Sequence, residues 1–144
     1  MAGRRSILST ALLVLVLAGC GAPNPYAQWK DLGAVYCNQV PLPRDAKFHD
    51  AEGGGRDKQS DNPTSESMAY WFSTKESPER LVAFYEKAFP TAEKVVAPDG
   101  ETTFWVKPDG GQEGEHVSIT VHGDGKIQIG EETKPGRHQD TGNL

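Results

Sequence analysis

The chain has 144 residues and a formal net charge of −5, with 36% hydrophobic and 24% charged residues. This length suits one domain with a modest core, and the composition is neither that of a membrane-spanning protein nor that of a wholly disordered one. The acidic balance argues against a nucleic-acid partner and against electrostatic adhesion to anionic lipids, because both need a basic surface.

Residues 1–19 have the layout of a secretory signal peptide. Arg4 and Arg5 precede an almost entirely apolar run from Ile7 to Ala18. That run is shorter than the roughly 20 residues that span a bilayer, so we expect a cleaved leader and no transmembrane helix. Removal of the leader reduces the 15 basic residues to 13 against 20 acidic residues, which leaves a net charge of −7.

The leader ends in Leu17-Ala18-Gly19-Cys20, which resembles the lipobox of bacterial lipoproteins. The resemblance implies lipidation of Cys20, with diacylglycerol on its sulfur and acyl chains such as palmitate. These chains would anchor the protein on the extracytoplasmic face of a membrane, because two or more acyl chains give stable attachment. Gly21 follows the cysteine and permits outer-membrane sorting if the source is Gram-negative. The alternative is an ordinary signal peptide cleaved near Ala18, with Cys20 an incidental thiol.

Composition divides the rest of the chain into a tether, a domain and a tail. We expect residues 20–30 to hold the lipidated cysteine and a flexible tether, residues 31–132 to form a single α+β domain, and residues 133–144 to be a disordered tail. Within the domain, residues 31–40 indicate an edge strand or coil. Residues 50–66 are rich in glycine and polar side chains and predict a mobile loop.

A strand and then a helix are the clearest local signals. Residues 68–73 (MAYWFS) predict a strand with Tyr70 and Phe72 on one face and Trp71 on the other. Ser77 is a suitable N-cap and Pro78 suits the first helical position. Residues 78–89 then carry one apolar stripe at helical spacing: Leu81, Phe84, Tyr85, Ala88 and Phe89.

Four short strands are expected after the helix, at 93–97, 102–107, 116–122 and 126–131, because Pro-Asp-Gly and Gly-Asp-Gly turns separate them. The order of elements predicts an α+β fold. It would be a two-layer sandwich, with one main helix (about 78–89) packed on an antiparallel, meander-type sheet of about four to six strands.

Residues 41–129 resemble small, uncharacterised bacterial envelope lipoprotein domains. The resemblance rests on a Pro-rich entry at 41–46, on Ser77-Pro78-Glu79-Arg80 and on the helix sequence at 82–87. Because these are packing features, the resemblance implies the fold and brings no activity with it.

The sequence offers no recognisable catalytic or metal-binding motif, so we expect no enzyme activity, no cofactor and no metal. His116 and His122 would lie roughly 20 Å apart on one strand, too far for one ion. Cys37 has no C-x-x-C partner and is either a buried small residue or a reactive thiol. Glu131 and Glu132 are expected to be solvated.

Two tryptophans form the candidate binding patch. Trp71 and Trp105 have the opposite strand parity to Tyr70 and Phe104, so we expect them on a face that the helix does not cover. The alternative is that the first element, residues 32–40, folds over them.

These features predict a membrane-anchored envelope lipoprotein whose domain is a non-catalytic binding or accessory module. Its partner would be an envelope protein, peptide or glycan. The alternative is a small envelope hydrolase or a small-ligand sensor, which would need a deep pocket with perturbed titratable residues.

Overall fold

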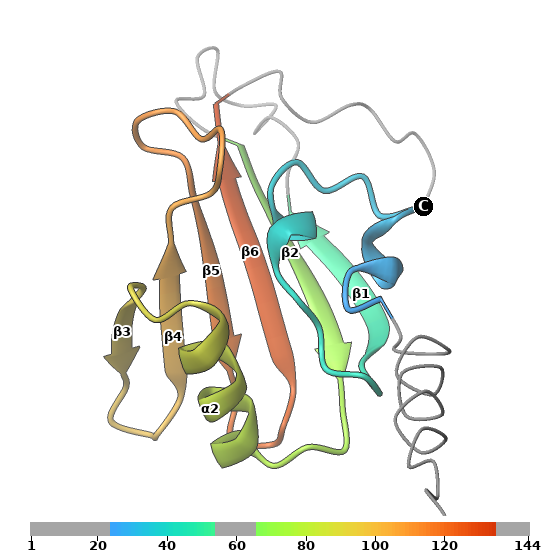
Figure 1. The fold of residues 1–144 in the computed structure, drawn as a ribbon, viewed down its shortest axis with the longest axis vertical. Helices are drawn as coiled ribbons and strands as arrows, with labels where there is room; N and C mark the ends of the chain where they lie inside the picture. The colour runs from blue at the N-terminus through green and yellow to red at the C-terminus, as the bar shows by residue number, and fades with distance from the viewer. Residues whose placement is uncertain (1–23, 54–65, 135–144) are drawn as a thin grey trace, which may run out of the picture.

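The computed structural model describes residues 24–53 and 66–134. Cys20, the predicted leader and most of the predicted loop and tail lie outside these residues. The described part contains an α-helix and a six-stranded antiparallel sheet (Figure 1). The predicted helix and antiparallel sheet are therefore confirmed. No helix of this part is long and apolar enough to cross a membrane.

The sheet has the strand order β1-β2-β6-β5-β4-β3. Its last four strands form a meander, whereas the hairpin of the first two strands joins the sheet beside the final strand. The five strands that the sequence predicted, β2 to β6, agree with the structure to within two residues, whereas β1 was not predicted. The strand bounds are β1 Lys47–Gly53, β2 Glu66–Ser73, β3 Glu93–Val96, β4 Thr102–Val106, β5 His116–Val121 and β6 Ile127–Thr133.

Alternation along the strands gives the sheet one apolar face. In the register of the sheet, Tyr70 lies opposite Ile129, Ile129 opposite Ile119, and Ile119 opposite Phe104. All four side chains are at most 1% exposed. This cross-strand row is the centre of the core, because directly opposed side chains lie close enough to pack.

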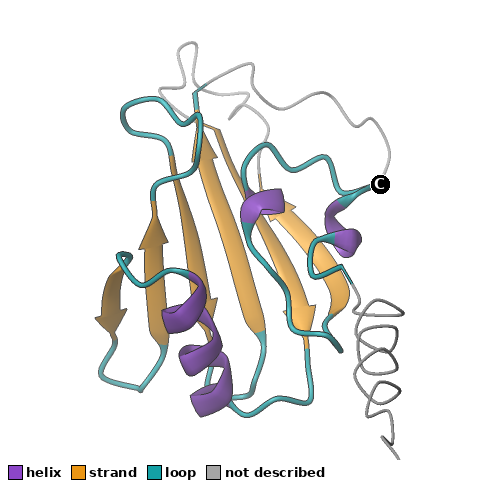
Figure 2. Ribbon diagram, in the orientation of Figure 1, coloured by secondary structure: helices purple, strands orange, loops and turns teal. Residues whose placement is uncertain are grey.

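Helix α2 (Pro78–Ala88) covers one half of the apolar face, over β4 and β5 (Figures 1 and 2). Its start is capped as predicted, since the Ser77 hydroxyl accepts the Arg80 N–H at 3.3 Å. Leu81 and Tyr85 are fully buried, and the Tyr85 ring lies 6.2 Å from that of Phe104. An eleven-residue helix is too narrow to cover six strands, so other residues must cover the rest.

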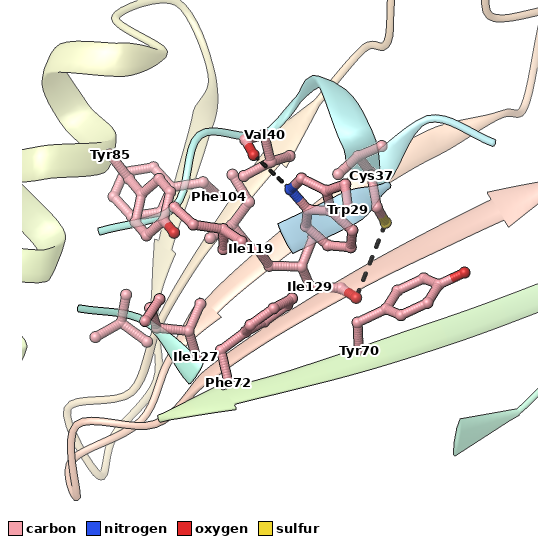
Figure 3. Packing of buried hydrophobic residues seen from close by; sticks show 14 of the residues in the cluster. Trp29, Cys37, Val40, Tyr70, Phe72, Tyr85, Phe104, Ile119, Ile127 and Ile129 are labelled. Atoms are coloured by element: carbon pink, nitrogen blue, oxygen red, sulfur yellow. Dashed lines mark hydrogen bonds between the residues drawn. The ribbon is translucent and has the colours of Figure 1, made fainter. Parts of the chain in front are cut away.

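The N-terminal segment, residues 24–46, covers the other half of the same face. It contains two short 3-10 turns, η1 (Ala27–Trp29) and η2 (Cys37–Gln39). Trp29 is 3% exposed, and its ring lies 5.3 Å from that of Tyr70 and 5.1 Å from that of Phe72 (Figure 3). Its indole N–H donates to the Val40 carbonyl at 2.9 Å.

Burial of Trp29 corrects the predicted tether of residues 20–30, because the domain begins before residue 31. Two further boundaries differ from the predictions. Residues 50–53 belong to strand β1 rather than to a loop, since they pair with β2 in the register Gly53 to Met68. Thr133 is 1% exposed in β6, so the predicted tail does not begin at residue 133.

A buried carboxylate fixes the N-terminal segment to the sheet. Glu131 is 2% exposed and accepts the backbone N–H groups of Val35, Tyr36 and Cys37 at 3.0, 2.7 and 2.8 Å. Several N–H donors can stabilise a carboxylate away from water. The expectation of a solvated Glu131 was therefore wrong: its strand parity directs it to the core side, whereas Glu132 is half-buried on the other face.

Candidate functional site

The second face of the sheet has no covering element among the described residues. Trp71 and Trp105 both lie on this open face, because their strand neighbours Phe72 and Phe104 belong to the core. Leu32 and Val40 pack in that same core cluster. The alternative that residues 32–40 cover the tryptophans was therefore wrong, and Trp105 is 41% exposed.

One cross-strand row defines a trough on the open face. The register aligns Ala69 with Gly130 and Gly130 with Ser118, so three adjacent strands present small side chains side by side. The same row continues to Trp105 on β4 and to Glu52 on β1. Small residues flanked by large ones leave a hollow that runs across the strands.

The hollow has a volume of about 440 Å³. Gly130 is at its centre, and a Cβ atom added there would approach the Ser118 hydroxyl to 2.8 Å. The absence of that side chain is what keeps the floor open. The residues that line the hollow include Glu52, Ala69, Trp105, His116, Ser118 and Glu132.

Trp105 closes one end of the trough and is held by a neighbouring histidine. The His116 ring contacts Trp105 edge-on, with 5.0 Å between ring centroids. His116 Nε2 also lies 3.4 Å from a carboxylate oxygen of Glu132. The indole is thus both oriented and accessible.

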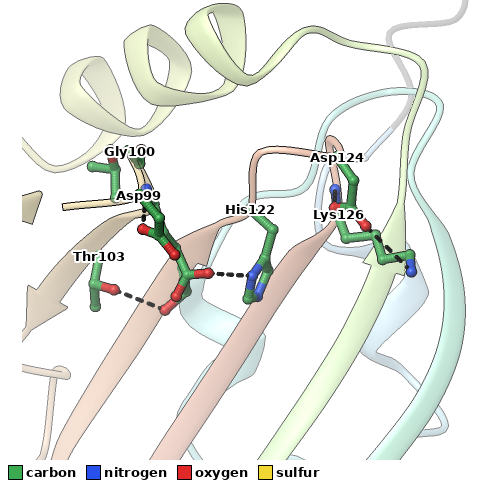
Figure 4. A network of polar contacts seen from close by, with 9 residues as sticks. Asp99, Gly100, Thr103, His122, Asp124 and Lys126 are labelled. Atoms are coloured by element: carbon green, nitrogen blue, oxygen red, sulfur yellow. Dashed lines mark hydrogen bonds and ion pairs between the residues drawn. The ribbon is translucent and has the colours of Figure 1, made fainter. Parts of the chain in front are cut away.

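Trp71 lies in a separate hollow of about 280 Å³ that it shares with Asp50 and Lys126. Its ring stacks on that of His122, with 5.1 Å between centroids and an angle of 22°. His122 Nδ1 lies 2.7 Å from a Glu101 carboxylate oxygen (Figure 4). The two tryptophans therefore share a face but not a hollow, and Trp71 is the more constrained.

Two nitrogen atoms in this stack are buried without a hydrogen-bond partner among the described residues: Trp71 Nε1 and His122 Nε2. Burial of such atoms costs free energy. The His122 side chain is only 20% exposed, because it packs against Trp71.

A further pocket of about 440 Å³ opens on the covered side, between the end of α2 and η2. Its lining is mixed: Val40, Phe89 and Val117 contribute apolar side chains, and Lys107 and Asp109 contribute charged ones. Gln39 fixes one wall, since its side chain accepts the Asp109 N–H at 2.8 Å and donates to the Asp109 carbonyl at 3.0 Å.

The strongly shifted titratable groups lie in the core. Burial, with help from the nearby Glu131 carboxylate, raises the pKa of Cys37 well above its usual value. Burial also raises the pKa of Tyr85 and of Tyr70. Cys37 is 0% exposed, so of the two interpretations the buried small residue agrees with the structure. In residues 24–53 and 66–134, no three side chains of His, Cys, Asp or Glu gather in a metal-binding group.

Searches of protein-family models, curated proteins and solved structures gave no significant match to this chain. Sequence reasoning identified both tryptophans but missed the trough floor. Gly130, inside a strand of otherwise alternating side chains, was the available signal for the floor. An isolated glycine in a strand often marks a site where a ligand or another backbone approaches closely.

Proposed function

We propose that this chain is the precursor of a membrane-anchored envelope lipoprotein whose domain is a non-catalytic binding module. The observation that carries the proposal is the open face of the sheet, where Trp105 is 41% exposed beside a trough floored by small residues. Exposed aromatic side chains next to a hollow are typical of interaction surfaces. Its partner would be an envelope protein, peptide or glycan.

The proposed anchor is Cys20, on the resemblance of residues 17–20 to a lipobox. Trp29 is buried nine positions after Cys20 in the sequence. Nine residues span at most about 30 Å, so the lipid would hold the domain close to the membrane surface. The localisation proposed is the extracytoplasmic face of a membrane, and the outer membrane if the source is Gram-negative.

The fold proposed is a two-layer α+β sandwich. Helix α2 and the N-terminal segment would form one layer and the sheet the other (Figure 2). This arrangement supports the binding role, because both covering elements are on one side and no described residue covers the second sheet face, which a partner could therefore reach.

A small-ligand sensor is the second candidate, and the pocket between α2 and η2 is the observation that favours it. Its mixed lining, with Val40 and Phe89 beside Lys107, suits a small amphipathic molecule. The groups with shifted pKa values, such as Cys37 and Tyr85, do not line this pocket, so hydrolase chemistry has less support than simple binding.

Quantitative crosslinking in cells tests the binding role. The affinity-tagged full chain would be compared with Trp105→Ser and with Ala83→Ser, a change at an exposed position of α2 on the covered side. We expect a partner that is lost with Trp105→Ser and kept with Ala83→Ser. If both variants capture the same molecules as the parent, the open face is not the binding surface.

The anchor is tested separately by substitution of Cys20. We expect Cys20→Ser to move the protein from the membrane fraction to the soluble fraction and to remove the mass of the acyl groups from the N-terminal peptide. An N-terminus cut near Ala18 with an unmodified Cys20 would refute lipidation and support the ordinary signal peptide.

A further inference from the structure

We propose that the trough binds an extended, positively charged peptide segment of the partner. This inference rests on the proposed function, since it names the class of ligand for the same face. The dimensions of the trough, the charges around it and the exposed indole all favour this class of ligand.

The trough has the size of one extended chain. From Glu52 on β1 to Trp105 on β4 the row crosses four strand spacings, which is about 19 Å. The next side chains on this face lie about 6.6 Å to either side of the row, because they are two residues further along each strand. About five or six residues of extended peptide fill such a length.

The margins of the trough are acidic. Glu52 ends the row on β1, Glu93 lies opposite Trp105 beyond the other end, and Glu132 forms part of a wall. Among the described residues that line the trough, none is lysine or arginine. Complementary charge favours a cationic ligand and accelerates its encounter with the site.

Trp105 adds a contact that suits the same ligand. An indole attracts lysine and arginine side chains through the face of its ring. His116 contacts Trp105 edge-on and lies beside Glu132, so one side chain orients both the ring and the carboxylate. A cationic side chain placed at this end would meet the indole and Glu132 together.

A glycan is the competing ligand for this surface. Sugar rings also stack on tryptophan, but a neutral glycan gains nothing from the carboxylates at the ends and wall of the trough. The peptide accounts for the charge and for the aromatic residue, whereas the glycan accounts only for the latter.

The test uses the full chain, produced with its own leader and purified in a nonionic detergent. Fluorescence anisotropy would compare two labelled peptides of equal length, (Ala-Lys)3 and (Ala-Glu)3. We expect the lysine peptide to bind at least about tenfold more tightly, and its affinity to fall with added salt because salt screens exposed charges.

Charge reversal locates the binding surface. Glu52→Lys/Glu132→Lys should weaken binding of the lysine peptide about tenfold. The control Glu79→Lys/Glu113→Lys changes the net charge equally, at exposed positions of α2 and of the loop before β5. Ser118→Leu, which fills the floor without changing charge, should also weaken binding. Unchanged circular dichroism and melting temperature would show that each variant folds.

Two results would overturn the proposal. One is equal binding of the two peptides, and the other is an equal loss of affinity in the control pair. A β-1,4-linked N-acetylglucosamine tetramer serves as the glycan probe. If this tetramer alone binds and quenches the fluorescence of Trp105, the proposed ligand class is wrong and the binding role of the face stands. If no probe binds and crosslinking in cells is insensitive to Trp105→Ser, the proposed function fails as well.

Discussion

The Glu131 carboxylate accepts the backbone N–H of Tyr36 at 2.7 Å, although 95 positions separate the two residues in the sequence. With the bonds to Val35 and Cys37, this contact holds the N-terminal segment against β6. The segment must be held there because α2 covers only part of the apolar face. Placement of the segment on that side leaves the open face to Trp71 and Trp105.

Substitution of Glu131 by Gln should destabilise the domain. The amide nitrogen of Gln would face N–H donors, and the charge that strengthens the three bonds would be lost, so we expect the free energy of unfolding to fall by about 2 kcal/mol. Urea unfolding monitored by tryptophan fluorescence measures this. The neighbouring Glu132→Gln is the matched control and should stay within about 0.5 kcal/mol of the parent. Equal effects of the two changes would contradict the role given to Glu131.

Truncation of Trp29 and truncation of Trp105 should destabilise the domain to different extents. Trp29 is 3% exposed and contacts Tyr70 and Phe72, whereas Trp105 is 41% exposed. We expect Trp29→Ala to cost about 3–5 kcal/mol because it opens a cavity in the core. Trp105→Ala should cost less than about 1 kcal/mol. Thermal and urea denaturation of both variants checks the order, and a larger loss for Trp105 would show that the open face is covered.

Cys37 should resist alkylation in the folded protein. Burial raises the pKa of its thiol and keeps it protonated, and the thiolate is the reactive form. Incubation with iodoacetamide at pH 8 should leave Cys37 unmodified in buffer and modify it fully in denaturant, as measured by peptide mass spectrometry. In the same digests, a Cys20 that stays unmodified even in denaturant is the result expected of a lipidated sulfur. Rapid modification of native Cys37 would exclude a buried thiol.

The Asp45 carboxylate makes the stability of the domain depend on pH in the acidic range. Its carboxylate accepts the Thr74 hydroxyl at 2.6 Å and the Lys75 N–H at 2.7 Å, and these bonds lower its pKa. The pKa of Asp45 is lower in the folded state than its ordinary value in the unfolded state. Its contribution to the free energy of unfolding is therefore complete above the ordinary pKa and is lost as the pH falls through the lowered pKa.

The Asp45→Asn variant should therefore melt below the parent at pH 7, and the gap should narrow as the pH falls below 4. Asp31→Asn, at an exposed position, serves as the control and should show no such trend. If the difference in melting temperature between Asp45→Asn and the parent is the same at every pH, the charge of Asp45 does not contribute to stability.

The parts of the fold that could be predicted are those with local signals. The cap at Ser77, the stripe of Leu81 and Tyr85, and the turn sequences between strands all act over a few residues, and the structure contains the corresponding helix and strands. Trp71 and Trp105 were placed on one face by strand alternation alone, and the sheet register agrees.

The parts that were missed depend on long-range contacts. Trp29 follows two prolines in a polar stretch, and only its packing on Tyr70 and Phe72 makes it a core residue. Strand β1 has one half-buried side chain, Ala51, and is held by pairing with β2. The trough requires Ala69, Gly130 and Ser118 to fall in one row, which the strand register decides and no single strand reveals.

The central claim is that the open face of the sheet meets a partner in the cell. A photo-crosslinking amino acid placed at position 105, and separately at the exposed position 83 of α2, tests it at contact distance in living cells. We predict a discrete crosslinked product from position 105 and none from position 83. Absence of a product from position 105, or the same product from both positions, would contradict the claim.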